Sequence, residues 1–160
     1  MPLRHFDEEL SDLKTKLLRM AAQAEDQIDK ALTALVTRDT ALAREVIERD
    51  HLVNALDVEI DEESIRLLAL HQPAARDLRL VTTAMKIATE LERISDLAEN
   101  VCERAIELNE EPQLKPYIDI PTMGNMARMM VKQSIDAFVK EDAALARKVL
   151  AWDKGASWCA

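Results

Sequence analysis

Residues 81–103 read VTTAMKIATELERISDLAENVCE, and they contain the most informative pattern of the chain. A row of side chains recurs along it at intervals of three or four residues, which places the row on one face of a helix. The row is apolar at its start and consists of carboxylates at its end. Its members are Val81, Met85, Ala88, Glu92, Asp96, Glu99 and Glu103. The stretch therefore predicts a long helix that packs against a core at its start and presents oxygen atoms at its end.

The whole chain is rich in helix-forming residues. Its 160 residues are 48% hydrophobic and 32% charged, with two Gly, five Pro and 3% aromatic residues, a composition typical of an all-α protein. Apolar residues at helical spacing predict helices over about residues 6–38, 40–70, 73–108 and 122–140, and another after residue 142. Long helices joined by short connections favour an antiparallel bundle.

An internal repeat divides the chain. Residues 36–50 align without gaps to residues 139–153, an offset of 103, and both copies contain the run Asp-x-Ala-Leu-Ala-Arg. We therefore predict a three-helix bundle over residues 1–109, a Pro-containing linker over 110–121, and the start of a second, incomplete repeat over 122–160. Because the third helix of the second repeat is missing, we expect a longer parent gene and a truncated or frameshifted end.

The charge and the cysteine content exclude several function classes. The net charge is −9 and no basic stripe is visible, which argues against nucleic-acid binding. Two cysteines are too few for a disulfide framework. The sequence shows no signal peptide and no run of about 20 apolar residues, so we expect a cytoplasmic protein without direct membrane insertion. The acidity suits cation binding, a basic protein partner or simple solubility.

The preceding predicted helix carries a second row that changes in the same way. The members of this second row are Asp50, Asn54, Asp57, Asp61, Ser64 and Leu68. If the two helices form a hairpin that closes near Pro73, facing residues have numbers that add to about 149. Asp57 then faces Glu92, and Asp50 lies near Glu99. Both rows change from apolar to oxygen-bearing side chains at the same level along the hairpin, which favours a binding site.

Crowded carboxylates repel one another, at a cost of roughly 0.2–0.5 kcal/mol for each i,i+4 pair on an isolated helix. A bound cation would remove this repulsion, and carboxylate ligands alone suit hard ions such as Mg²⁺, Ca²⁺, Mn²⁺ or ferric iron. The candidate ligands are Asp57, Asp61, Glu92 and Asp96, followed by Asp50, Glu99 and Glu103 as weaker candidates. The alternative interpretation is a solvated acidic face on a metal-free helical adaptor, whose partner supplies basic residues.

A catalytic interpretation has less support. Glu48 and His51 form one Glu-x-x-His motif, whereas ferritin-like di-iron bundles use two such motifs and two further Glu residues. The sequence has no Gly-rich phosphate loop, and it offers no set of nucleophile, His and acid. We therefore expect a binding or regulatory protein and not an enzyme.

Two further motifs carry a family resemblance. The first is QPAARDLR at residues 72–79, and the second is KIATELERISD at residues 86–96, followed by AEN at residues 98–100. At this spacing they resemble the PhoU family of phosphate-uptake regulators, and the similarity covers about residues 5–153.

The resemblance implies roles for several residues and a set of partners. Glu92 and Asp96 match the family's Glu(Asp)-x-x-x-Asp metal motif, and Asp57 and Asp61 supply a second copy of it. The family implies a cytosolic, dimeric, all-α regulator that restrains phosphate uptake and represses the phosphate regulon when phosphate is plentiful. Its implied partners are the phosphate ABC transporter ATPase and the phosphate sensor histidine kinase, and its implied metals are iron, magnesium or manganese. The chain departs from the family at its C-terminus, where the second bundle's acidic motif is absent.

Overall fold

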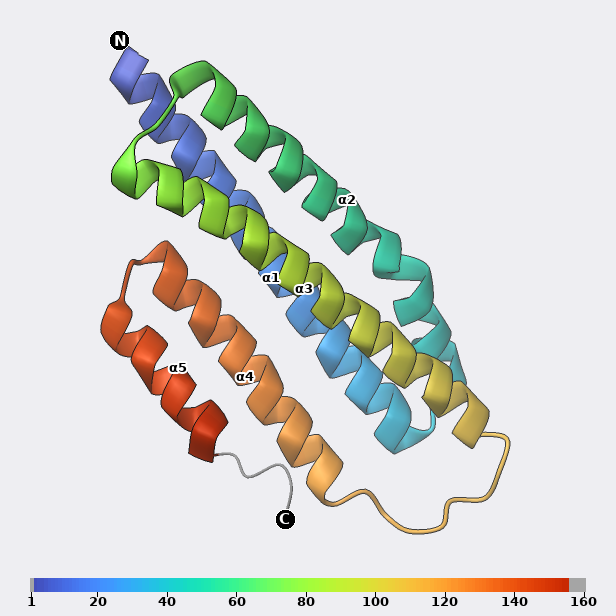
Figure 1. Cartoon of the computed structure of the whole chain (residues 1–160). Helices are drawn as coiled ribbons and strands as arrows, with labels where there is room; N and C mark the ends of the chain where they lie inside the picture. The colour runs from blue at the N-terminus through green and yellow to red at the C-terminus, as the bar shows by residue number, and fades with distance from the viewer. Residues whose placement is uncertain (1, 156–160) are drawn as a thin grey trace.

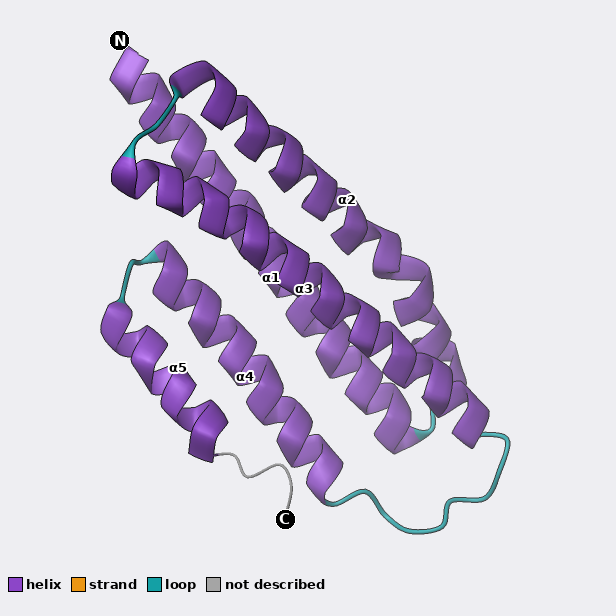
Figure 2. Ribbon diagram, viewed as in Figure 1, coloured by secondary structure: helices purple, strands orange, loops and turns teal. Residues whose placement is uncertain are grey.

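The computed structural model describes residues 2–155, which form five helices and no strand (Figure 1 and Figure 2). The helices are α1 (Pro2–Thr37), α2 (Thr40–His71), α3 (Ala75–Leu108), α4 (Asp119–Val139) and α5 (Ala143–Gly155). The predicted all-α class is confirmed. Residues 156–160, in which the sequence loses its similarity to the first repeat, lie outside the described residues.

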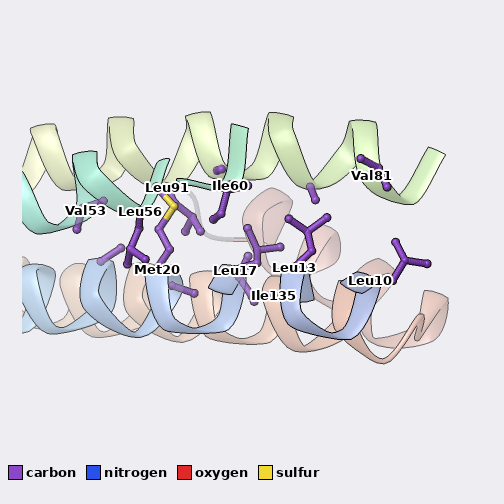
Figure 3. Packing of buried hydrophobic residues seen from close by; sticks show 14 of the residues in the cluster. Leu10, Leu13, Leu17, Met20, Val53, Leu56, Ile60, Val81, Leu91 and Ile135 are labelled. Carbon is purple, nitrogen blue, oxygen red and sulfur yellow. The ribbon is translucent and has the colours of Figure 1, made fainter. Parts of the chain in front are cut away.

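Helices α1, α2 and α3 pack side by side as an antiparallel bundle (Figure 1). The apolar stripe of α1 lies in the centre of the bundle, where Leu13, Leu17 and Met20 have no exposed surface. Ile60 of α2 and Val81 of α3 are equally buried, and Figure 3 shows these side chains between the helices. Burial of one such side chain contributes about 1.5–3 kcal/mol, so this stripe is a main source of the bundle's stability.

The turn between α1 and α2 recurs between α4 and α5. Arg38 has a φ of 57°, and the following Asp39 carboxylate accepts a hydrogen bond at 3.0 Å from the amide three residues later, which caps α2. At the offset of 103 residues, Glu141 has a φ of 54°, and the Asp142 carboxylate accepts the corresponding bond at 3.0 Å. The shared backbone and cap geometry agrees with the repeat in the sequence.

Two helix starts differ from the sequence prediction. α3 begins at Ala75, so Pro73 lies ahead of this helix and not in its first turn. Because Gln72 ends α2 in a left-handed conformation (φ 45°), Pro73 belongs to the connection that follows. α4 begins at Asp119, earlier than predicted, since Pro121 fits the first turn, where its missing N–H would have no intrahelical partner.

α4 packs against α1 and α5, and within residues 2–155 its backbone does not closely approach that of α3. A Cβ atom at Gly124 would lie 2.0 Å from Leu32 Cδ1, so glycine lets α4 lie directly on the side chains of α1. Residues 109–118 connect α3 to α4. The predicted division into a first bundle, a linker and a second repeat stays a prediction.

One carboxylate near the N-terminal end of the bundle is buried among basic side chains. Glu9 of α1 is 6% exposed, and its oxygens lie 2.7 Å from Arg66 Nη1 and 2.6 Å from His71 Nε2, both on α2. His5 Nε2 lies 3.6 Å from the same carboxylate. Burial alone would raise the pKa of Glu9, but the hydrogen bonds from Arg66 and His71 outweigh burial and hold its pKa below the usual range.

Candidate metal site

Three carboxylates meet where α2 and α3 lie side by side. Asp50 of α2 and Asp96 and Glu99 of α3 each place one oxygen so that all three oxygens lie within 4.8 Å of one another. All three side chains are half-buried. The sequence register predicts that Asp50 lies near Glu99, and the structure agrees. Asp50 and Glu99, weaker candidates by sequence, thus form the centre of the acidic region together with Asp96.

Neighbouring polar side chains hold Asp50 in place. Ser95 Oγ donates a hydrogen bond to Asp50 Oδ1 at 2.9 Å, and Asn54 Nδ2 donates one to Asp50 Oδ2 at 3.1 Å. Ser95 is fully buried, and its hydroxyl also contacts the side chain of Gln27, which is 6% exposed on α1. Residues of all three helices therefore fix the direction of the Asp50 carboxylate.

The remaining predicted ligands lie around this centre. Glu92 is half-buried one turn before Asp96 on the same helix. Asp57 is half-buried on α2. Asp61 and Glu103 are exposed at the ends of the two rows. The structure thus brings five of the predicted ligands into one half-buried region and leaves Asp61 and Glu103 at its edge.

Burial and mutual repulsion raise the pKa of several carboxyl groups in this region. Burial raises the pKa of Glu99, and the nearby charge of Asp50 raises it further. Burial also raises the pKa of Glu92, with a further contribution from the charge of Asp96. The pKa of Asp57 is raised by burial and then by the charge of a neighbouring carboxylate. The region is therefore electrostatically strained when all its carboxyl groups are ionised.

No basic side chain in the described part of the chain neutralises these groups. None of the seven predicted ligands forms an ion pair with a Lys, Arg or His nitrogen within 4.0 Å among residues 5–155. Asn54 Oδ1 lies beside them as a buried acceptor without a hydrogen-bond partner in the same range. The groups available to coordinate a metal in this region are therefore oxygen atoms, and their negative charge is not compensated.

Sequence reasoning missed Gln27 and Ser95. Gln27 lies in the buried stripe of α1, three residues after Ala24 and four before Ala31. Ser95 lies four residues after the buried Leu91 of α3 in the same way. Because a polar side chain at a core position requires a hydrogen-bond partner, both residues could have been identified as supporting groups.

The Glu-x-x-His motif of α2 lies away from the bundle core. Glu48 and His51 are both exposed, and His51 Nδ1 lies 2.7 Å from the backbone oxygen of Glu48. In di-iron bundles the ligands project inward from facing helices. The placement of these two residues does not fit such a centre.

The fold and this region define a class: an all-α bundle with a half-buried carboxylate face between two antiparallel helices. Residues 17–105 match the PhoU domain family. The chain is 43% identical over 145 residues to the phosphate-specific transport system accessory protein PhoU homolog of Aquifex aeolicus. It is 36% identical over 149 residues to the accessory protein PhoU of Escherichia coli. The chain belongs to the PhoU family.

Solved structures of PhoU proteins have the same fold. The crystal structure of PhoU from Pseudomonas aeruginosa superimposes with a TM-score of 0.89 at 41% identity, covering 94% of this chain and 72% of that one. The phosphate transport system regulatory protein PhoU from Streptococcus pneumoniae gives a TM-score of 0.85 at 27% identity, covering 94% and 70%. The predicted bundle and the family resemblance are confirmed.

The matched region is shorter than the relatives themselves. It covers 91% of this chain but 66% of the Aquifex aeolicus protein, and 93% of this chain but 62% of the Escherichia coli protein. Among the described residues, no helix combines the length and the apolar character that a membrane span requires.

Proposed function

We propose that this chain is a metal-binding regulator of phosphate transport. The observation that carries the metal site is the convergence of Asp50, Asp96 and Glu99 within 4.8 Å, with no basic side chain of residues 5–155 paired to them. Burial raises the pKa of Glu99, and the charge of Asp50 raises it further; a multivalent cation would offset this repulsion.

The donor set fits a hard cation. Asp50, Asp96 and Glu99 offer carboxylate oxygens, and the buried Asn54 Oδ1 is a further oxygen, without a hydrogen-bond partner among the described residues. Oxygen donors of this kind suit magnesium, manganese or ferric iron and not a thiolate-seeking metal. Glu92, one turn before Asp96, extends the site along α3, and Asp57 extends it along α2.

The regulatory role rests on the relatives. Those from Aquifex aeolicus and Escherichia coli are described as accessory proteins of the phosphate-specific transport system. We infer that this chain acts in the cytoplasm as a homodimer, restraining phosphate uptake when phosphate is plentiful. Its proposed partners are the phosphate transporter ATPase and the phosphate sensor histidine kinase, and the role requires no catalysis.

Metal analysis of the purified protein tests the site. The variant Asp96→Asn/Glu99→Gln removes two charges from its centre, and Glu59→Gln/Glu62→Gln removes two charges from the exposed surface of α2. Titration with Mn²⁺, followed by calorimetry, should show binding to the wild-type and the α2 variant and a loss of at least tenfold in affinity for the first variant. Equal affinities for all three proteins would refute the site.

The regulatory role has a separate test. Immobilised phosphate transporter ATPase should bind the wild-type chain in a sensorgram, and Mn²⁺ should change that affinity. The Asp96→Asn/Glu99→Gln variant should bind with an affinity that Mn²⁺ does not change. Metal binding without any ATPase or kinase binding would leave the site in place and refute the partners.

A further inference from the structure

A cleft of about 280 Å³ lies between α1 and α2. Its walls come from residues 22–30 of α1 and 46–52 of α2, so the first bundle forms them without the second repeat. The volume is close to the lower limit of about 300 Å³ for small-molecule sites, which suits a compact ligand. The side chains of these walls show which chemistry such a ligand would have.

Two glutamine amides of α1 supply neutral polar groups to the cleft. Gln23 lines it, and its Oε1 is buried without a hydrogen-bond partner in the described part of the chain. Gln27 Oε1 accepts a hydrogen bond from Ser95, so the amide nitrogen of Gln27 is the group left to donate to a bound molecule. Because a buried acceptor without a partner is unfavourable, the cleft favours a ligand that carries a hydrogen-bond donor.

Two basic side chains of the cleft converge on one anionic oxygen. Lys30 Nζ lies 3.6 Å and Arg49 Nη1 lies 3.3 Å from Glu45 Oε1. The Glu45 side chain is 48% exposed, so it can turn into solvent and release both cations. Asp26, the one carboxylate in the lining, pairs with Lys30 at 2.9 Å and leaves the lining with an excess of one positive charge. An anionic group of a ligand can therefore replace Glu45 beside Lys30 and Arg49.

Apolar side chains complete the cleft. Val46 is buried in its wall, and Leu52 is 39% exposed beside it. A flat ring placed against these two side chains would cover apolar surface that water now reaches. The cleft thus combines an apolar wall, an acceptor that needs a donor, and a pair of cations.

We propose that this cleft binds a purine mononucleotide such as AMP, at a site separate from the carboxylates around Asp50. The adenine ring lies against Val46 and Leu52, and its 6-amino group donates a hydrogen bond to Gln23 Oε1. The Gln23 amide nitrogen donates to N7 of the base, which is the pairing by which glutamine recognises adenine. The phosphate lies beside Lys30 and Arg49, in the place of the Glu45 carboxylate.

Calorimetric titration of the full 160-residue chain with AMP tests this proposal. In metal-free buffer we expect a Kd on the order of 100 µM. Adenosine lacks the phosphate and inorganic phosphate lacks the base, so each should bind at least tenfold more weakly than AMP. Because no metal is present, failure of AMP to bind would leave the proposed Mn²⁺ site untouched, and the separate Mn²⁺ titration decides that site.

Variants of the basic pair and of its competitor sharpen the test. Lys30→Gln/Arg49→Gln should weaken AMP binding at least tenfold. Glu45→Gln removes the carboxylate that competes with the phosphate and should tighten AMP binding at least threefold, a gain that a misfolded variant could not produce. Arg79→Gln/Lys86→Gln removes two positive charges from exposed positions of α3 and is the matched control, which should bind AMP like the wild-type.

A further variant tests recognition of the base. Gln23→Leu removes the amide at similar size and should weaken AMP binding at least tenfold. Absence of AMP binding to the wild-type, or equal AMP affinity in the wild-type and Lys30→Gln/Arg49→Gln, would overturn the proposal. Equal affinities for AMP and inorganic phosphate, or an unchanged AMP affinity in Gln23→Leu, would overturn it too, because the cleft would then not recognise the base.

Discussion

Glu9 and the carboxylates around Asp50 lie in one bundle, yet their surroundings have opposite effects. Glu9 is 6% exposed, and Arg66 and His71 hold its pKa below the usual range despite burial. Glu99 is less deeply buried, but within the described part of the chain no basic side chain is paired with it, and its pKa is raised. A region that supplies its own cations is complete as a structural element. A region that concentrates carboxylates without them is suited to a cation from solution.

The largest expected effect is stabilisation by metal. Mn²⁺ at one hundred times its Kd should raise the free energy of unfolding by about 2.7 kcal/mol, because it binds the folded state and not the unfolded chain. Thermal melts with and without Mn²⁺ measure this gain. The gain should persist in Glu9→Gln and vanish in Asp96→Asn/Glu99→Gln. If both variants lost the stabilisation by Mn²⁺, the assignment of metal binding to the carboxylates around Asp50 would be contradicted.

Removal of the buried hydroxyl beside Asp50 should have the next largest effect. Ser95→Ala deletes the hydrogen bond to Asp50 Oδ1 and leaves the Gln27 side chain without this partner, at a cost of about 1–2 kcal/mol. Urea unfolding without metal measures the change. Thr89→Ala on the exposed side of α3 is the control, and its stability should stay within about 0.5 kcal/mol of the wild-type. An equal loss of stability in Ser95→Ala and Thr89→Ala would contradict a specific role of Ser95 in holding Asp50 and Gln27.

Neutralising one carboxylate of the cluster should stabilise the protein slightly. Glu99→Gln removes repulsion from Asp50 and Glu103, and it should raise the free energy of unfolding by about 0.5 kcal/mol without metal. Glu107→Gln is the matched control, since Glu107 pairs with Arg104 at 2.7 Å and its loss should give no gain. Urea unfolding at pH 7 measures both variants. A stabilised Glu107→Gln or a destabilised Glu99→Gln would contradict the repulsion assigned to Glu99.

The smallest expected effect is a difference in pH dependence. The pKa of Glu99 is raised in the folded state, so Glu99 destabilises the fold at neutral pH and this penalty fades as the pH falls through the raised pKa towards 4.5. The pKa of Glu9 is lowered, so its stabilisation is present above 4.5 and is lost as the pH falls below that value. Stability profiles of Glu99→Gln and Glu9→Gln against the wild-type should therefore diverge in opposite directions. Parallel profiles would contradict the opposite pKa shifts of Glu9 and Glu99.

Regular helix geometry explains what could be predicted from the sequence. α2 and α3 are antiparallel helices that rise by the same distance per residue. Residues equally far from the turn at Pro73 therefore lie side by side, which was enough to place Asp50 beside Glu99. The cap at Asp39 was also predictable, because its carboxylate needs only the amides that follow it.

The support of the site depends on long-range packing and could not be placed from spacing alone. Ser95 and Gln27 meet across two helices, and their contact depends on how α1 is rotated about its axis. The starts of α3 and α4 were misjudged for a related reason. Prolines such as Pro73 and Pro121 are compatible with a first turn and with a connection, so local sequence did not decide between them.

The segment from residue 109 to residue 118 acts as a tether for the α4–α5 hairpin. A chain of this length keeps a detached hairpin at a millimolar effective concentration near α1, so release and return are unimolecular and do not depend on protein concentration. The hairpin contacts the first three helices through the packing of α4 on α1, which buries Ile135, and through the ion pair between Arg76 of α3 and Glu141 at 2.6 Å. Its separation would break this interface and leave the packing of α1, α2 and α3 in place. In hydrogen exchange, the amides of α4 and α5 should therefore exchange together and sooner than those of α1, α2 and α3.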